Sequence, residues 1–229
     1  MSKGKVFIVI ISVIIFFIGL GLIAGGGALL WSNSFLRDAE GYYSTKTVDI
    51  ERDSYAVTTY PAHINFGPDW VFDWSELVKV KLKATDNKGK GVFVGIAEEN
   101  KLLGYLSGVD RDEITKFDMD YPFGSTEIEY REFPGSAPNE APTQQDFWTT
   151  SAAGSDEQVL RWGIEEGRYS IAIMNQDGSR GLDISGSIGV KIPMIKGLGI
   201  GLLIGGLVVL LFSFALVYVA VSRSRVAEE

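Results

Sequence analysis

The stretch "LVKVKLKATDNKGKGVFVGIA", residues 77–97, sets the fold class of the central part of this chain. In its first half, Val80 and Leu82 alternate with Lys79 and Lys81. Because successive side chains of a β-strand point to opposite faces, this alternation predicts a strand with one buried face and a basic outer row. The segment "DNKGKG" predicts a loop, and "VFVGIA" predicts a continuous apolar strand in the centre of a sheet.

The same pattern extends outward over most of residues 32–196, where short alternating or apolar runs are separated by turn residues. "EENKLLGYLSG" (98–108) predicts a helix of about two turns. "PGSAPNEAPTQQ" (134–145) predicts an exposed loop, and "NQDGS" (175–179) predicts a tight hairpin. No strand–helix–strand rhythm is present, so we expect an antiparallel β-sandwich, jelly-roll-like in its connections.

Two apolar runs flank this region, at residues 6–31 and 197–221. Both exceed the roughly 20 apolar residues that cross a bilayer. The first run is also longer than the apolar core of a signal peptide, which favours an uncleaved anchor. The sequence therefore predicts a mainly β domain between two transmembrane helices.

Basic residues at the chain ends predict the orientation. Lys3 and Lys5 precede the first run, while Arg223 and Arg225 follow the second. Under the positive-inside rule, residues 1–5 and 222–229 are cytoplasmic, and the central domain lies outside a plasma membrane.

The composition excludes several functions. The 229 residues include no cysteine, which rules out disulfides and thiol nucleophiles. Residues 32–196 hold 17 Lys and Arg against 27 Asp and Glu, and this acidity argues against nucleic acid as a partner. His63 is the single histidine, so a multi-histidine zinc site is excluded. We expect no cofactor and no catalytic residue.

Glycines recur within both apolar runs. Gly21 and Gly25 are four residues apart, as are Gly197, Gly201 and Gly205. Small residues at this spacing let transmembrane helices approach closely. We expect these glycines to pack the two helices antiparallel, tightest in the outer leaflet and splayed toward the cytoplasm. The alternative is that the same faces pair between two chains.

Acidic and aromatic residues provide the candidate sites. The weak calcium candidates in "VDRDEITKFDMD" are Asp110, Asp112, Asp118 and Asp120. A solvated acidic face is the expected alternative for this stretch. The aromatic residues Trp70, Trp74 and Trp148 could form a binding or interface surface, although packing in the core or contact with the bilayer is the simpler interpretation.

Two resemblances add to this reading. "EEGRYSIAIMN" resembles the closing strands of small secretory sandwiches such as the GOLD domain of p24 proteins. More of the chain, from "GGGALLW" through "VFVGIA", "QDFWTTSAAG" and "LRWGIEEGRYSIAIMNQDGSRG", resembles an uncharacterised family of two-pass membrane proteins common in actinobacteria. That resemblance implies the two-anchor architecture and no activity.

Three functions remain open at this point. The first is a binding or scaffold module that engages a protein or envelope partner, membrane lipid or a second copy of itself. The second is an accessory subunit of a larger transporter or envelope complex. The third is a carboxylate-dependent extracytoplasmic hydrolase, which would need paired carboxylates at a suitable separation.

Overall fold

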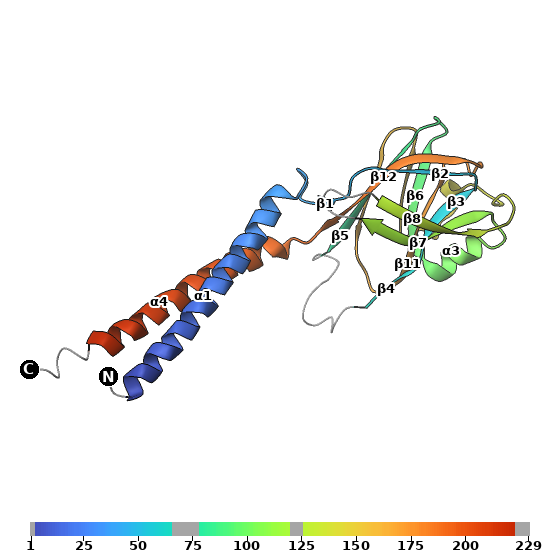
Figure 1. The fold of residues 1–229 in the computed structure, drawn as a ribbon. Helices are drawn as coiled ribbons and strands as arrows, with labels where there is room; N and C mark the ends of the chain where they lie inside the picture. The colour runs from blue at the N-terminus through green and yellow to red at the C-terminus, as the bar shows by residue number, and fades with distance from the viewer. Residues whose placement is uncertain (1–2, 66–77, 120–125, 223–229) are drawn as a thin grey trace, which may run out of the picture. The chain divides into compact units, whose positions relative to one another are not determined.

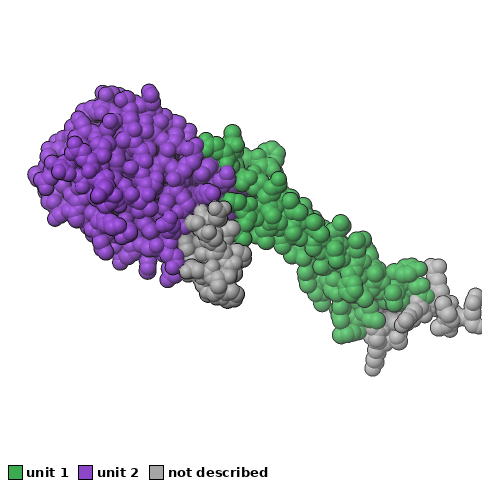
Figure 2. Space-filling model, turned by 180° about the vertical axis from the view of Figure 1, so that it is seen from behind, with its two compact units in different colours: residues 1–41, 193–229 green, residues 42–192 purple. Residues whose placement is uncertain are grey.

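A computed structural model describes residues 3–65, 78–119 and 126–222 (Figure 1). The chain divides into two compact units, one formed by residues 1–41 with 193–229 and the other by residues 42–192 (Figure 2). In chain order, the elements are α1 (Lys3–Phe35), β1 (Tyr43–Ser44), β2 (Val48–Arg52), β3 (Ala56–Thr59), β4 (Ala62–Ile64), β5 (Lys79–Asp86), β6 (Val92–Glu98), α3 (Glu99–Tyr105), β7 (Arg111–Met119), β8 (Thr126–Phe133), the 3-10 turn η1 (Pro142–Gln144), β9 (Thr150–Gly154), β10 (Gln158–Gly163), β11 (Gly167–Asn175), β12 (Leu182–Lys191) and α4 (Met194–Ser222).

The first unit is a pair of long apolar helices. Segments of 30 residues in α1 (Val6–Phe35) and 27 residues in α4 (Met194–Ala220) are long and apolar enough to cross a membrane. The two helices lie side by side along their length (Figure 1). They run antiparallel, because Ser12, Gly19 and Gly26 of α1 face Ser213, Gly206 and Gly199 of α4 in reverse order.

The helices meet along a seam of small residues with a seven-residue period. The buried positions are Ser12, Gly19 and Gly26 in α1 and Gly199, Gly206, Ser213 and Ala220 in α4. A strict repeat of seven keeps one face toward the partner in a left-handed supercoil. Ser213 Oγ donates a hydrogen bond of 2.8 Å to the carbonyl of Ser12 inside this seam.

The glycines predicted to form this joint are not the ones in it. A Cβ built on Gly21, Gly25, Gly197, Gly201 or Gly205 meets nothing within 4 Å. By contrast, a Cβ on Gly26 would lie 2.7 Å from the carbonyl oxygen of Gly199. The four-residue spacing was therefore the wrong period for this contact, because two antiparallel helices that stay in contact along their length repeat the contact about every seven residues.

The predicted splaying is also wrong. The rings of Phe16 and Phe214 are 5.8 Å apart, and Ala220, near the end of α4, is only 3% exposed. The seam therefore continues well past the glycines.

The second unit is a sandwich of two β-sheets. Sheet A has the order β1-β12-β5-β10, with β2 also paired to β12. Sheet B has the order β8-β7-β3-β11-β6-β9, with β4 also paired to β11. All described pairs are antiparallel except β3 with β7, which is parallel. The expected sandwich is confirmed, but sheet B is mixed because β7 reaches β3 through the α3 connection.

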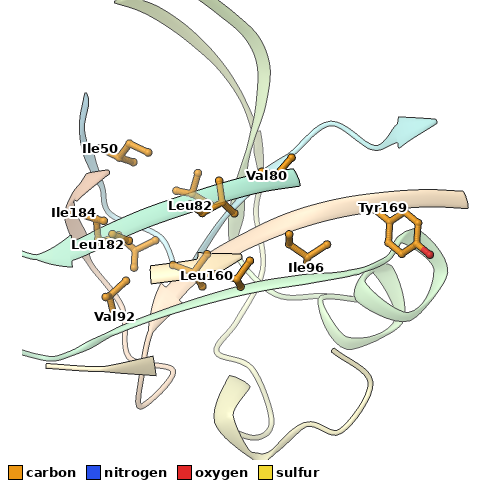
Figure 3. Close-up of a cluster of buried hydrophobic side chains, with 12 residues drawn as sticks. Ile50, Val80, Leu82, Val92, Ile96, Leu160, Tyr169, Leu182 and Ile184 are labelled. Atoms are coloured by element: carbon orange, nitrogen blue, oxygen red, sulfur yellow. The ribbon is translucent and has the colours of Figure 1, made fainter. Parts of the chain in front are cut away.

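The main core lies between the sheets. Leu82, Val92, Leu182 and Ile184 are among the buried side chains that fill it (Figure 3). On β5, Val80, Leu82 and Ala84 are buried, as the alternation predicts. Lys81 departs from the expected basic outer row, since it is only 3% exposed, with its Nζ 4.4 Å from the centre of the Tyr42 ring.

A second core covers the outer face of sheet B. Leu102 and Leu106, from α3 and its end, pack with Phe93 and Met174. This helix agrees with the prediction for residues 98–108, and the cover explains why "VFVGIA" is apolar throughout. Both faces of β6 are buried.

The "NQDGS" prediction is wrong in one respect. Residues 175–179 form a turn, with Gly178 at φ 74°, but the turn does not close a hairpin. Strand β11 before it belongs to sheet B, and β12 after it belongs to sheet A. The Asp-Gly pair thus marks a crossing between the two layers.

Candidate functional site

A pocket of about 240 Å³ lies between the two sheets of the sandwich. Strands β2, β5 and β12 of sheet A form one wall, and β3, β6, β7 and β11 of sheet B form the other. Its described lining residues are mostly aliphatic, and Lys83 is the one charged residue among them. The Lys83 ammonium pairs with Glu157 at 3.0 Å. The pocket can therefore hold an apolar group and offers no charge of its own to a buried ligand.

The pocket exists because small residues meet in one row of sheet A. The register places Gly186 opposite Val48 on one side and Ala84 on the other. Gly186 lies between Ile184 and Ile188, which both contribute to the core. Since alternate residues of a strand share a face, the missing side chain of Gly186 leaves space in the interior. A Cβ built there meets only the Lys83 carbonyl oxygen, at 3.1 Å.

A β-bulge shapes the opposite wall. The pairing of β7 with β8 shifts between Ile114 and Lys116, which leaves Thr115 as the extra residue. Residues three apart on a regular strand face opposite ways, but an inserted residue restores a common face. Ile114 and Phe117 consequently both line the pocket.

Two of the three hydroxyl side chains among the described lining residues are engaged by the backbone, and the third belongs to Ser187. Thr59 Oγ1 accepts a hydrogen bond from the Ile171 amide at 3.1 Å. Thr45 Oγ1 accepts one from the Ile188 amide at 3.2 Å and donates to the Lys46 carbonyl. These threonines therefore hold strands together, and the wall remains effectively apolar.

An ion pair joins the sheets at the edge beside the pocket. Arg52 of β2 makes two bonds to Asp112 of β7, with Nε–Oδ2 at 2.9 Å and Nη2–Oδ1 at 2.7 Å. The Arg52 guanidinium lies 4.7 Å from the Tyr130 ring centre and also bonds Glu132. A bidentate pair of this kind fixes geometry as well as charge.

The environment of Asp112 holds its carboxyl ionised. Burial alone would raise its pKa, but hydrogen bonds from Arg52 and Ser54, together with the Arg52 charge, outweigh burial and hold the pKa below its usual value. The hydrogen bond to Asp112 likewise raises the pKa of Arg52. Glu113, 7% exposed, pairs with Arg131. The expectation of a solvated acidic face is therefore wrong at Asp112 and Glu113.

The other acidic candidates are dispersed. Asp110 pairs with Arg180 at 2.9 Å, and Asp118 lies 3.9 Å from Lys116. Asp120 lies outside the described residues. Within residues 3–65, 78–119 and 126–222, no three His, Cys, Asp or Glu side chains form a group that could hold a metal ion. The three described calcium candidates, Asp110, Asp112 and Asp118, thus each lie within 4 Å of an arginine or lysine side chain.

The ammonium group of Lys90 binds the turn at residues 175–181. Lys90 Nζ donates a hydrogen bond of 2.6 Å to the Arg180 carbonyl, next to the Gly181 carbonyl at 3.4 Å. Asn175 Nδ2 donates to the carbonyls of Ser179 and Gly181. These contacts stabilise the layer crossing and leave its carbonyl groups already occupied.

Trp148 is a packing residue of the second core. Its ring lies 4.8 Å from that of Phe93, and its Nε1 donates to the Pro142 carbonyl. The absence of a side chain at Gly95 makes room for it, because a Cβ there would lie 2.5 Å from the Trp148 ring. Trp70 and Trp74 lie outside the described residues. The single histidine, His63, is exposed on β4.

Comparison with known proteins assigns the chain to no family. No protein-family model matches the chain, and no curated protein matches it. The resemblance to the two-pass family therefore stays a prediction.

The pocket is the feature that sequence reasoning missed. Its signal was present in "LDISGSIGVKI", where Gly186 takes a position that the alternation of Ile184 and Ile188 assigns to an apolar side chain. A glycine inside a strand marks a bulge, a close approach or a missing volume. Only the register to Ala84 shows that it is missing volume.

Proposed function

We propose that this chain is a membrane-anchored, extracytoplasmic binding module without catalytic activity, whose jelly-roll-like sandwich takes up an apolar ligand between its sheets. The observation that carries the proposal is the apolar pocket. A concave, mainly apolar site with few polar groups is the usual form of a small-molecule binding site.

Several features of the chain support the rest of the proposal. If the edge strands β1, β4, β7 and β8 are set aside, the remaining orders β2-β12-β5-β10 and β3-β11-β6-β9 resemble the two four-stranded sheets of a jelly roll, which supports the jelly-roll-like connections. The two apolar helices supply the anchors, and their flanking Lys and Arg supply the orientation. The carboxylates considered for hydrolysis, such as Asp112 and Glu113, are tied to arginines, which favours binding over catalysis.

Photolabelling with a small apolar carbene precursor, 3-(trifluoromethyl)-3-phenyldiazirine, tests the proposal. The full chain is labelled in lipid nanodiscs, and modified peptides are mapped by mass spectrometry. We expect label on α1 and α4, which serve as an internal reference, and on the peptides that contain Ile171 and Ile173. Gly186→Leu fills the pocket and should remove the label from β11 while leaving the label on the helices.

Ala153→Leu is the matched control. Ala153 is exposed on β9 and does not line the pocket, so a leucine there adds three carbon atoms, against four at Gly186, without entering the pocket. Its labelling should equal that of the parent chain. Labelling of the helices alone in the parent, or equal β11 labelling in Gly186→Leu, would reject the binding function.

A further inference from the structure

We propose that the ligand of this pocket is one unbranched hydrocarbon chain, such as the acyl chain of a membrane lipid or of a free fatty acid, inserted past Phe117. This inference rests on the proposed binding function and specifies its ligand class.

The size of the pocket limits the ligand to one chain. Its volume of about 240 Å³ lies below the roughly 300–1,000 Å³ of sites for drug-sized molecules. It exceeds the roughly 150 Å³ of a cavity that accepts benzene. A polycyclic or two-chain ligand is therefore too large to be enclosed, and a single chain or its terminal part fits.

The shape of the pocket favours an elongated ligand. Four neighbouring strands of sheet B line it, in the order β7-β3-β11-β6. At about 4.8 Å between strands, these cover about 14 Å. Along the strands the lining runs from Ile171 to Ile173 on β11, or about 7 Å, and from Ile114 to Phe117 on β7, or about 10 Å. The pocket is a slot between the sheets, longer across the strands than along them.

Exposure locates the mouth of the slot. Phe117, on β7, is 41% exposed, whereas Val94, on β6 at the other end, is 2% exposed. The Arg52–Asp112 pair bridges β2 and β7 at this edge, two residues from the lining residues Ile50 and Ile114. Asp112 lies five residues from Phe117 on β7 and is buried, so the mouth is at Phe117 rather than at the ion pair, and the far end of a ligand is directed toward Val94.

Because the wall is mostly aliphatic, the part of the ligand that enters the slot has to be hydrocarbon, and any polar group of the ligand has to stay outside. Thr45 Oγ1 both accepts and donates a backbone hydrogen bond, and Thr59 Oγ1 accepts one, so a polar group pushed inside this mainly aliphatic wall would lose its water and gain few partners. Each additional buried methylene should strengthen binding about fourfold, so affinity should rise with chain length until the slot is full.

Two photoactivatable probes test the ligand class in the full chain in nanodiscs. One is a fatty acid with a diazirine at the end of its chain, and the other is a phosphatidylcholine carrying the same chain. We expect the terminal diazirine to label β6 or β11 near Val94 and its cross-strand partner Ile173. Linear fatty acids of increasing length should compete better, and a sterol should compete at least tenfold less well than the best chain.

Variants at the mouth provide the second readout. Phe117→Ala should weaken competition about fivefold, which corresponds to about 1 kcal/mol. Phe117→Leu should retain most of it, because the aliphatic contact remains. Equal competition by the sterol, or no effect of Phe117→Ala, would overturn the acyl-chain proposal even if the small diazirine still labels the pocket.

The two probes also separate the sources of the chain. Labelling by both indicates that lipid acyl chains reach the slot, and labelling by the fatty acid alone indicates a free acid. If neither probe labels the sandwich while the small diazirine does, the pocket binds another apolar group and this inference is wrong. If the small diazirine also fails, the proposed function itself falls.

Discussion

Replacing Gly206 with leucine should loosen the α1–α4 pair, whereas the same replacement at the adjacent Gly205 should not. A Cβ at Gly206 would lie 2.7 Å from Ile23 Cγ1 and 2.8 Å from the Gly19 carbonyl oxygen. Ordinary contact begins near 3.4 Å, so the helices must separate by about 3.4 − 2.7 = 0.7 Å for that atom alone. A gap of this size removes a quarter to a half of the dispersion energy of each contact along the seam.

The expected loss is about 1–3 kcal/mol, the usual cost of overpacking a close-packed site. Losing the Ser213–Ser12 hydrogen bond as the helices part would add about 0.6 kcal/mol, up to about 1.7. At Gly205 nothing lies within 4 Å of the added atom, so the change should stay within about 0.5 kcal/mol.

The assay is SDS titration of the full chain in mixed bicelles. Phe7→Cys and Tyr218→Cys, both exposed positions, carry pyrene labels whose excimer emission reports the paired state. Labelling is specific because the chain has no cysteine of its own. Gly206→Leu should move the unfolding midpoint to lower SDS, and Gly205→Leu should not. Equal midpoints, or a larger shift for Gly205→Leu, would show that the seam is assigned to the wrong face.

Three further predictions concern the sandwich. Gly95→Ala should destabilise it by about 1–3 kcal/mol in urea unfolding, because the new methyl meets the Trp148 ring; an unchanged midpoint would contradict the placement of that ring. Asp112→Asn should cost about 2–3 kcal/mol at neutral pH, because it removes the buried carboxylate partner of Arg52 and leaves that guanidinium only the exposed Glu132. Folding lowers the pKa of Asp112, so the ionised carboxylate stabilises the fold above about pH 4, and this stabilisation is lost as the pH falls through the folded-state pKa. The free energy of unfolding of Asp112→Asn should therefore fall less steeply in acid than that of the parent chain. Parallel plots of this free energy against pH for the two proteins would refute the prediction. Burial raises the pKa of Tyr105 to about 12, so a difference titration of tyrosinate absorbance against Tyr105→Phe should show one group ionising near that pH, and a difference centred near 10 would contradict it.

Period-two alternation was enough to predict the sandwich and its main strands. The alternation of Val80, Leu82 and Ala84 identified an inward face, and the continuous run in β6 identified a central strand. These features depend on local geometry, which the sequence contains. The parallel pairing of β3 with β7 depends on where α3 returns the chain, and no local pattern shows that.

The helix seam illustrates a choice between two real patterns. Glycines occur at spacings of both four and seven in these helices, and only the packing angle decides which spacing repeats the contact. Gly19 and Gly26 were visible in the same segment as Gly21 and Gly25. The seven-residue relation to Ser12 was the additional clue, since small polar residues continue the same stripe.

The pocket depends on contacts that are remote in sequence. Gly186 and Ala84 are about a hundred residues apart and meet only through register. The bulge at Thr115 likewise appears only in the pairing of β7 with β8. The Arg52–Asp112 ion pair also joins residues that are remote in sequence, because they lie on different sheets. The sequence alone could not show that these two charges neutralise one another.

The central claim is that the sandwich carries an apolar ligand, and native mass spectrometry of the full chain released from membranes tests it most directly. The parent chain and Ala153→Leu should retain a bound lipid or fatty acid that Gly186→Leu lacks, with lipids held by the helices common to all three. Identical bound species in all three proteins, or none in the parent, would contradict the account.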